Sequence, residues 1–400
     1  MTRGGAAITV VYRNIALLAL AQAVLMTGTS VLITTSALVG RDLAGDPALA
    51  TLPLGLQFLA MTLATIPASL FMGHFGRRAG FLVGIGLGLC GTLLAGYAIM
   101  TDSLVVFCLA ALLIGAFNGT GQFYRFAAAD IAPEGRRARA ISLVLAGGIV
   151  AGFTGPSLAA WTRTLMAPDF AASYLVLGSL YLIGVLAIAL LRIPLPPRRV
   201  RRASGRPLPV IAGQPTFMVA VAAATVGYGA MNLLMVATPL SMEAHHHPFD
   251  DVAFVIQWHV LAMFVPSFFT GELVRRFGLL RILGIGAVLM IACVGINWSG
   301  HGVWQYWTAL VCLGVGWNFL FVGGTTLLTE TYAEEEKAKC QAVNDFVVFG
   351  TVTVTALSSG LLYSLLGWQL LNAVVLPFLL LVLAGLFWVH LRSRGQGAPL

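Results

Sequence analysis

Charged residues are scarce in this chain. Asp, Glu, Lys and Arg make up 10% of its 400 residues, whereas about a quarter of a typical soluble protein is charged. Hydrophobic residues make up 58%, and the mean hydropathy is +0.90. This composition excludes a water-soluble fold and predicts an all-α protein of the lipid bilayer. A hydrocarbon core about 30 Å thick needs about 20 apolar residues per helix, so the length allows about twelve spans.

Several sequence features of enzymes are also missing. The five cysteines form no C-x-x-C pair, which argues against a disulfide framework or a thiolate cluster. No Gly-rich phosphate loop follows a predicted strand, so ATP is not expected to drive the protein. The basic residues are not interleaved with aromatic ones, so no nucleic acid is expected as a partner. We therefore expect a protein that is not an enzyme and holds no cofactor.

Charges and Gly/Pro clusters divide the apolar sequence into twelve predicted helices. They are expected near residues 15–39, 48–72, 79–100, 103–125, 140–161, 172–192, 213–239, 252–271, 281–298, 303–329, 342–363 and 368–390. The longest polar break runs from Arg192 to Pro209, and its three closely spaced prolines and five following arginines are typical of a linker. The predicted organisation is a six-helix bundle at 1–192, a basic cytoplasmic linker at 193–209 and a second six-helix bundle at 210–400.

The basic residues predict the orientation of these helices. If the N-terminus is cytoplasmic, 21 of the 23 Lys and Arg lie on the cytoplasmic side, with Arg41 and Arg163 as the exceptions. This asymmetry is the usual positive-inside pattern. It predicts a multi-pass membrane protein with both termini in the cytoplasm. The outer segments then carry an excess of acids, which weakly favours the arrival of cations.

The two halves repeat a short motif at an offset of about 200 residues, half the chain. Phe75-Gly76-Arg77-Arg78 precedes Gly84-Ile85-Gly86, and Arg275-Arg276-Phe277-Gly278 precedes Gly284-Ile285-Gly286. In its helix count, linker and repeat the chain resembles the major facilitator superfamily, whose loop motif G-x-L-x-D-R-x-G-R-R ends as Gly76-Arg77-Arg78 does. The resemblance implies two six-helix halves that move about a site near the membrane midplane, and hence transport.

Polar side chains inside the spans are costly in lipid and therefore informative. No carboxylate or guanidinium is predicted at the midplane. Eight amide side chains remain, as cavity lining or as interhelical hydrogen bonds: Gln22, Gln57, Asn118, Gln122, Asn232, Gln257, Asn318 and Asn372.

One constellation stands out among the predicted helices. The seventh carries Met231 and Met235, and the eighth carries His259 and Met263. Residues at i and i+4 share one helix face, and consecutive antiparallel helices are often neighbours. Three thioethers and one imidazole are therefore expected to converge slightly outside the midplane. Neutral sulfur and imidazole ligands suit copper, and suit hard cations or zinc less well. Packing of the methionines in the core is the alternative.

This pattern of methionines and histidine resembles that of one branch of the superfamily. An M-x-x-x-M on the seventh helix with an H-x-x-x-M on the eighth is similar to the CcoA-type bacterial copper importers, a branch of the facilitator superfamily. The resemblance implies a copper ion as transported substrate, with Met231, Met235, His259 and Met263 as its ligands. It further implies uptake across the bacterial cytoplasmic (inner) membrane for the assembly of cbb3-type cytochrome oxidase, with an indirect link to the copper chaperones of that oxidase.

The outer loop between the two helices adds further candidate ligands. Met242, His245, His246 and His247 could capture a cation and pass it inward, or form a solvated loop without such a role.

Two rival functions stay open. An exporter of amphipathic organic compounds would use Phe, Trp and Met as adaptable apolar surface. A non-transporting assembly factor would keep the fold and hand metal to a partner.

Overall fold

The computed structural model describes residues 3–133, 140–141, 143–144, 146–193, 205–333 and 335–395. Every regular element in these ranges is helical, and no strand occurs among them. The predicted all-α fold is therefore confirmed.

The chain divides into two compact units, Met1–Arg199 and Val200–Leu400. Residues 194–204 of the predicted linker lie outside the described residues. The limits 1–192, 193–209 and 210–400 stay a prediction, and each unit is described by itself below.

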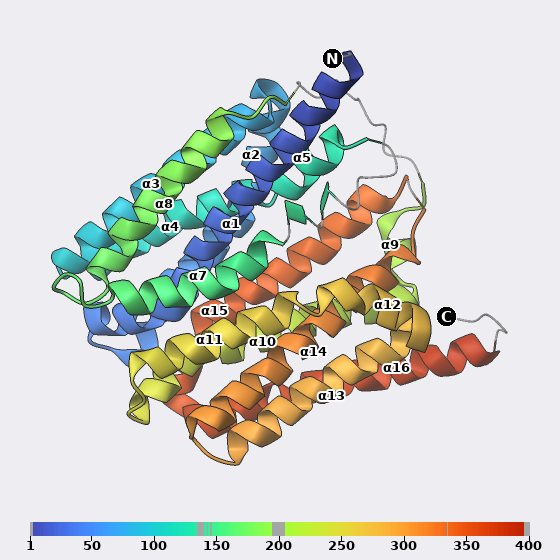
Figure 1. Cartoon of the computed structure of the whole chain (residues 1–400). Coiled ribbons are helices and arrows are strands. Elements are labelled where there is room, and N and C mark those ends of the chain that lie inside the picture. The colour runs from blue at the N-terminus through green and yellow to red at the C-terminus, as the bar shows by residue number, and fades with distance from the viewer. Residues whose placement is uncertain are drawn as a thin grey trace. The chain divides into compact units, whose positions relative to one another are not determined.

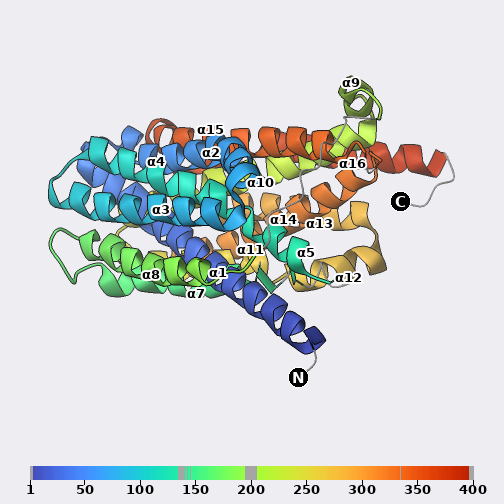
Figure 2. The same ribbon diagram turned by 90° about the horizontal axis from the view of Figure 1, so that it is seen from above.

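The first unit is a bundle of helices, drawn from blue to green in Figure 1. Its elements are α1 Arg3–Ala44, the 3-10 turn η1 Pro47–Leu49, α2 Leu52–Phe75, α3 Arg77–Met100, α4 Leu104–Gly121, α5 Tyr124–Ile131, α7 Gly147–Thr162 and α8 Ala171–Ala189. Helix α4 packs on α2 and α3, and α1 packs on α7. Figure 2 shows α3 and α4 side by side.

The second unit is a bundle of the same kind. Its elements are α9 Leu208–Ala212, α10 Pro215–Ala244, α11 Phe249–Phe264, α12 Ser267–Phe277, α13 Leu279–Trp298, α14 Val303–Thr329, α15 Lys337–Val374 and α16 Leu376–Gly395. Helix α14 contacts α10, α11 and α13, and α10 also packs on α15 and α16. Helices α10 and α14 are therefore the core of this unit.

The packing repeats between the units. Contacts α3·α4, α3·α8, α1·α7 and α1·α8 in the first unit correspond to α13·α14, α13·α16, α10·α15 and α10·α16 in the second. This correspondence agrees with the motif repeat at an offset of about 200 residues. It supports the prediction of two related bundles.

Fewer separate spans are found than the twelve predicted. Among the described residues nine helices are long and apolar enough to cross a membrane, or ten if the pair α11 and α12, bent by 46°, forms one span. One of the nine, Lys339–Arg392, contains both of the last two predicted helices, which meet at Gly367 with a φ of +69°. Helix α7, with 16 residues, is too short to be counted. With the bent pair counted as one span, these two regions account for the difference between ten and twelve.

Close helix contact in the first unit depends on small residues. A Cβ added at Gly155 of α7 would lie 2.4 Å from Ser30 Cβ on α1. At this position a larger side chain would push the two helices apart.

The end of the basic segment is fixed to the second unit by a buried carboxylate. Arg206 donates from Nε and Nη2 to the two oxygens of Glu336, at 3.0 and 2.8 Å, and its backbone N–H donates to Glu336 Oε1 at 2.6 Å. The Glu336 side chain is only 2% exposed. The Arg206 guanidinium, together with the Ala333 N–H, lowers the pKa of Glu336 to about 2. The described end of the predicted linker is therefore anchored to the second unit through Arg206.

We predict that Glu336→Gln loosens this anchor. The neutral amide cannot form the charge-assisted pair, so hydrogen–deuterium exchange of the Arg206 backbone N–H, which donates to Glu336, should become several-fold faster at neutral pH. Because the pKa of Glu336 is lowered, the native contact is complete above its ordinary value of 4.5 and is lost as the pH falls toward 2. Glu335→Gln, at the neighbouring exposed position, is the control. Equal exchange rates of this N–H in all three proteins would contradict the assignment.

Candidate metal and substrate site

The methionine pair of α10 is buried inside the second unit. Met231 is 1% and Met235 2% exposed. One turn before Met231, a Cβ added at Gly227 would lie 2.7 Å from Leu320 Cβ on α14. Because positions 227 and 231 share a helix face, Met231 lies on the side of α10 that packs on α14, and Met235 follows one turn later.

The imidazole of His259 is the most informative group of the site. It is 0% exposed, and its Nδ1–H donates to the Leu310 carbonyl of α14 at 2.8 Å. This bond fixes the tautomer, so Nε2 holds a lone pair. Nε2 is buried and has no hydrogen-bond partner among the described residues. Metal-binding histidines commonly donate the other ring N–H to a carbonyl in this way.

Helix α14 also positions Met263, which is 7% exposed. At Gly314, a Cβ would lie 2.8 Å from the His259 carbonyl oxygen and 3.1 Å from the Met263 nitrogen. The absence of a side chain at Gly314 therefore allows α11 to approach α14 at the H-x-x-x-M motif itself.

Asn318 holds the end of α11, where the chain bends at Pro266. Its Nδ2 donates to the Met263 carbonyl at 2.7 Å and to Ser267 Oγ at 2.6 Å. Its Oδ1 accepts from Thr270 Oγ1 at 2.7 Å. A broken helix leaves carbonyls without intrahelical donors, and an amide from a neighbouring helix satisfies one of them here.

The two candidate pairs, Met231 with Met235 and His259 with Met263, lie at one level along α14. Residues Ala220 and Gly227 of α10 contact Gly324 and Leu320 of α14. At a rise of about 1.5 Å per residue, Met231 and Met235 then lie beside about positions 312–317 of the antiparallel α14. His259 and Met263 contact positions 310, 314 and 318. The structure thus brings both pairs to the same stretch of α14, whereas the sequence predicted direct packing of α10 on α11 as the cause.

The predicted outer capture residues form a different arrangement. The rings of His245 and His301 stack, with centroids 3.8 Å apart, and the His247 Nε2–H donates to the His301 carbonyl at 2.6 Å. His246 is exposed, and Met242 is buried at 0% exposure. Desolvation and the nearby His245 and His247 lower the pKa of His301. Within the described ranges, no three His, Cys, Asp or Glu side chains are placed to hold a metal ion.

His301 was not predicted to join this cluster. It precedes the start of α14 by two residues, 54 positions from His247, and only the folded chain brings the two loops together. Capture of a cation by Met242, His245, His246 and His247 stays a prediction.

A cluster of aromatic rings was also missed. Tyr228 of α10 lies edge-on to Trp317 and Phe321 of α14, with centroids 5.3 and 5.2 Å apart, and 6.0 Å from Phe349 of α15. Trp317 stacks on Phe321 at 5.2 Å and lies 6.1 Å from Phe264 of α11. These five rings, here called the aromatic cluster, come from four helices. No sequence spacing relates them.

The amide side chains divide into two groups. Asn232 donates to the Val352 carbonyl, and Asn297 donates to Asn372 Oδ1 at 2.7 Å, so these amides join helices as one alternative predicted. In the first unit, both polar atoms of the buried Gln57 and the Oδ1 of Asn118 have no partner among the described residues. Lining of a cavity stays open for these two.

Two bundles of apolar helices with repeated packing and buried polar side chains are typical of the class of polytopic membrane transporters. The family model of the Major Facilitator Superfamily matches residues 18–240 and 219–399. The chain belongs to this superfamily, and it is a membrane transporter of that type.

Two relatives in sequence and one solved structure are similar to this chain. The chain is 41% identical over 398 residues to the riboflavin transporter RfnT of Brucella anthropi, covering 98% of each chain. It is 27% identical to the uncharacterised MFS-type transporter YddS of Bacillus subtilis, over 90% of this chain and 87% of that one. A bacterial homologue of the human lysosomal transporter Spinster, in an inward-facing and occupied conformation, shares the fold with a TM-score of 0.69 at 16% identity, covering 95% and 96%.

These comparisons support some of the predictions made from the sequence and not others. The superfamily and the transport activity are confirmed. The narrower likeness to copper importers gains no support from them, because the relative with a named substrate is a riboflavin transporter. The proposal that this chain transports copper therefore rests on the geometry of the site.

We predict that Asn318→Leu destabilises the second unit by about 1–3 kcal/mol, because the Met263 carbonyl and two hydroxyls lose a buried partner. The measurement is thermal unfolding of the purified protein in detergent. Asn372→Leu, which removes a buried amide far from the H-x-x-x-M motif, is a matched control. If the two variants unfold alike but Asn318→Leu alone lowers copper binding, the hydrogen bonds of Asn318 act on the site. An unchanged unfolding temperature for Asn318→Leu would show that these hydrogen bonds do not stabilise the end of α11.

Proposed function

We propose that the protein transports copper ions and binds them at Met231, Met235, His259 and Met263. The observation that supports this best is the His259 Nε2, a fully buried acceptor of fixed tautomer without a protein partner. An unsatisfied acceptor inside a bilayer is costly, which favours a ligand at that atom. Three buried thioethers flank the same stretch of α14.

The chemistry of these ligands suits a carrier. Thioether sulfur and neutral imidazole bind Cu(I) and add no charge of their own, so the charge at the site is that of the ion. A site without thiolate or carboxylate holds the ion reversibly, and a carrier must also release it. All four side chains belong to the second unit, so this unit alone would contain the ligands.

The direction of transport follows from the same proposal. With both termini cytoplasmic, the acid-rich outer loops face the source of the ion, and release is inward by alternating access. By likeness to CcoA-type importers, the membrane would be the bacterial cytoplasmic membrane and the copper would serve cbb3-type cytochrome oxidase.

We expect Met231→Ala, His259→Ala and Met263→Ala to lower copper accumulation at least about tenfold in cells that lack the native gene, because each removes a direct ligand. Radioactive copper uptake at equal protein level is the measurement. Met218→Ala is the control, since Met218 is on the same helix but 57% exposed. Uptake that is equal in all variants would exclude the site.

Riboflavin, or another planar heteroaromatic compound, is the second candidate substrate. Two observations favour it: the 41% identity to RfnT over 98% of both chains, and the aromatic cluster. Stacked and edge-on rings provide a surface on which a flavin ring system can lie. The Trp317 Nε1 is buried and has no partner within the described part of the chain, so it is an available donor.

For this second candidate, Trp317→Ala or Tyr228→Ala should lower riboflavin uptake about tenfold while His259→Ala leaves it intact. The test is radiolabelled riboflavin uptake by proteoliposomes that contain the purified full-length chain. Trp304→Ala, at a ring that is 67% exposed, is the control. Riboflavin uptake with copper uptake absent would overturn the copper proposal.

The same proteoliposomes decide the remaining alternatives. Copper uptake without any partner protein would exclude a non-transporting assembly factor. Efflux of amphipathic compounds without uptake of copper or riboflavin would favour the exporter.

A further inference from the structure

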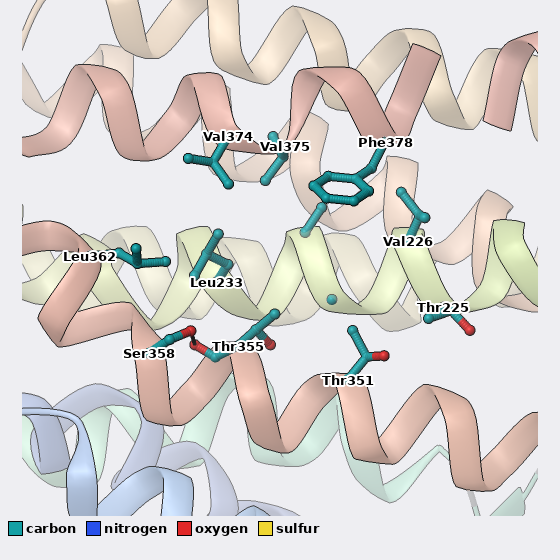
Figure 3. A pocket seen from close by; sticks show the side chains of 12 residues that line it. Thr225, Val226, Leu233, Thr351, Thr355, Ser358, Leu362, Val374, Val375 and Phe378 are labelled. Carbon is teal, nitrogen blue, oxygen red and sulfur yellow. Dashed lines mark hydrogen bonds between the residues drawn. The ribbon is translucent and has the colours of Figure 1, made fainter. Parts of the chain in front are cut away.

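A cavity lies within the second unit on the side of α10 away from α14. Its volume is about 310 Å³, and it is lined by α10, α15 and α16. Figure 3 shows Leu233 and Val226 of α10 facing Val374, Val375 and Phe378, with the hydroxyl-bearing residues of α15 on the other wall. All lining residues belong to one unit, so the cavity does not depend on how the two units are arranged.

The wall offers little to a polar occupant. No charged residue lines the cavity. The hydroxyls of Thr355 and Ser358 donate to carbonyls of their own helix, Val352 at 3.1 Å and Val354 at 2.8 Å. Of the lining hydroxyls, that of Thr225 is buried without a partner among the described residues. Uncharged hydroxyls such as those of Thr225 and Thr351 do not by themselves hold an ion, and a buried water needs about two to four polar partners.

The position of the cavity indicates which kind of molecule can occupy it. Residues 225–233 form the middle of α10, a helix of 30 residues that is long enough to cross the bilayer. Among the candidate spans of the described residues, Lys339–Arg392 on the other side is the least buried: 33% of its apolar 18-residue stretch is buried, against 72% for Pro215–Ala244. Phe378, which lines the cavity, is 53% exposed. In the membrane, this side therefore meets hydrocarbon.

We infer that the cavity holds an acyl chain of a membrane phospholipid. An empty cavity of this size would deprive its apolar walls of van der Waals partners, and a hydrocarbon chain supplies them without needing a hydrogen bond. The chain would support α10 from the side opposite Met231 and Met235. The site is separate from the proposed copper ligands, so its occupancy does not depend on which substrate is carried.

The test uses the full-length protein in bilayers of phosphatidylethanolamine and phosphatidylglycerol with a trace of phospholipid bearing a photoactivatable diazirine in the middle of one acyl chain. After illumination, the labelled residues are mapped by mass spectrometry. The expected result is label concentrated at 225–233, 351–362 and 374–378, above that on exposed lipid-facing residues such as Ile66.

Two variants fill the cavity from different helices, Ala230→Phe and Val375→Trp. Each should reduce this label to the level of the exposed surface, whereas Leu365→Phe, at a side chain 71% exposed, should leave it unchanged. Thermal unfolding identifies any variant that does not fold, and the other variant then decides. Uniform label over all exposed apolar residues, or label that persists in a folded cavity-filling variant, would overturn the inference.

Discussion

The hydrogen bond from His259 Nδ1 to the Leu310 carbonyl is the interaction on which the site depends. A backbone carbonyl within a helix is already an acceptor, so a second donor from α11 can bind it only if the two helices approach closely. Gly314 permits that approach, and Asn318 holds the end of α11 one turn further along. As a result the imidazole has one tautomer and one orientation, and its Nε2 is left as a buried acceptor. In water such an atom would be hydrated, but in a bilayer it needs a ligand.

The second unit contains two kinds of candidate binding surface, and they share α14. Leu310, Gly314 and Asn318 face the H-x-x-x-M motif, while Trp317 and Phe321 belong to the aromatic cluster. A soft metal ion and a flat heteroaromatic ring would therefore contact adjacent faces of one helix. This arrangement offers a physical reason why a chain 41% identical to a riboflavin transporter can be proposed to carry a different substrate. Under the copper proposal, side chains on α10 and α11 would decide what is bound within the fold of the superfamily.

Much of the fold could be predicted from the sequence, because apolar length and charge punctuation are local properties. The tenth predicted helix, 303–329, coincides with α14 Val303–Thr329, and the ninth, 281–298, differs from α13 Leu279–Trp298 only at its start. The contacts of the site could be predicted only in part. The i,i+4 spacing groups Met231 with Met235 on α10 and His259 with Met263 on α11. It could not indicate that α14 lies beside both pairs, that Asn318 binds the Met263 carbonyl, or that His301 stacks on His245, since each of these depends on residues more than 50 positions apart.

The most direct test of copper binding at His259 is X-ray absorption spectroscopy at the copper edge of the purified protein loaded with Cu(I). We expect one imidazole nitrogen together with thioether sulfurs around the metal. In His259→Ala the imidazole signal should disappear while sulfur scattering remains. A protein that binds no copper, or a copper signal that is identical in native protein and His259→Ala, would contradict the central claim that His259 Nε2 is a metal ligand.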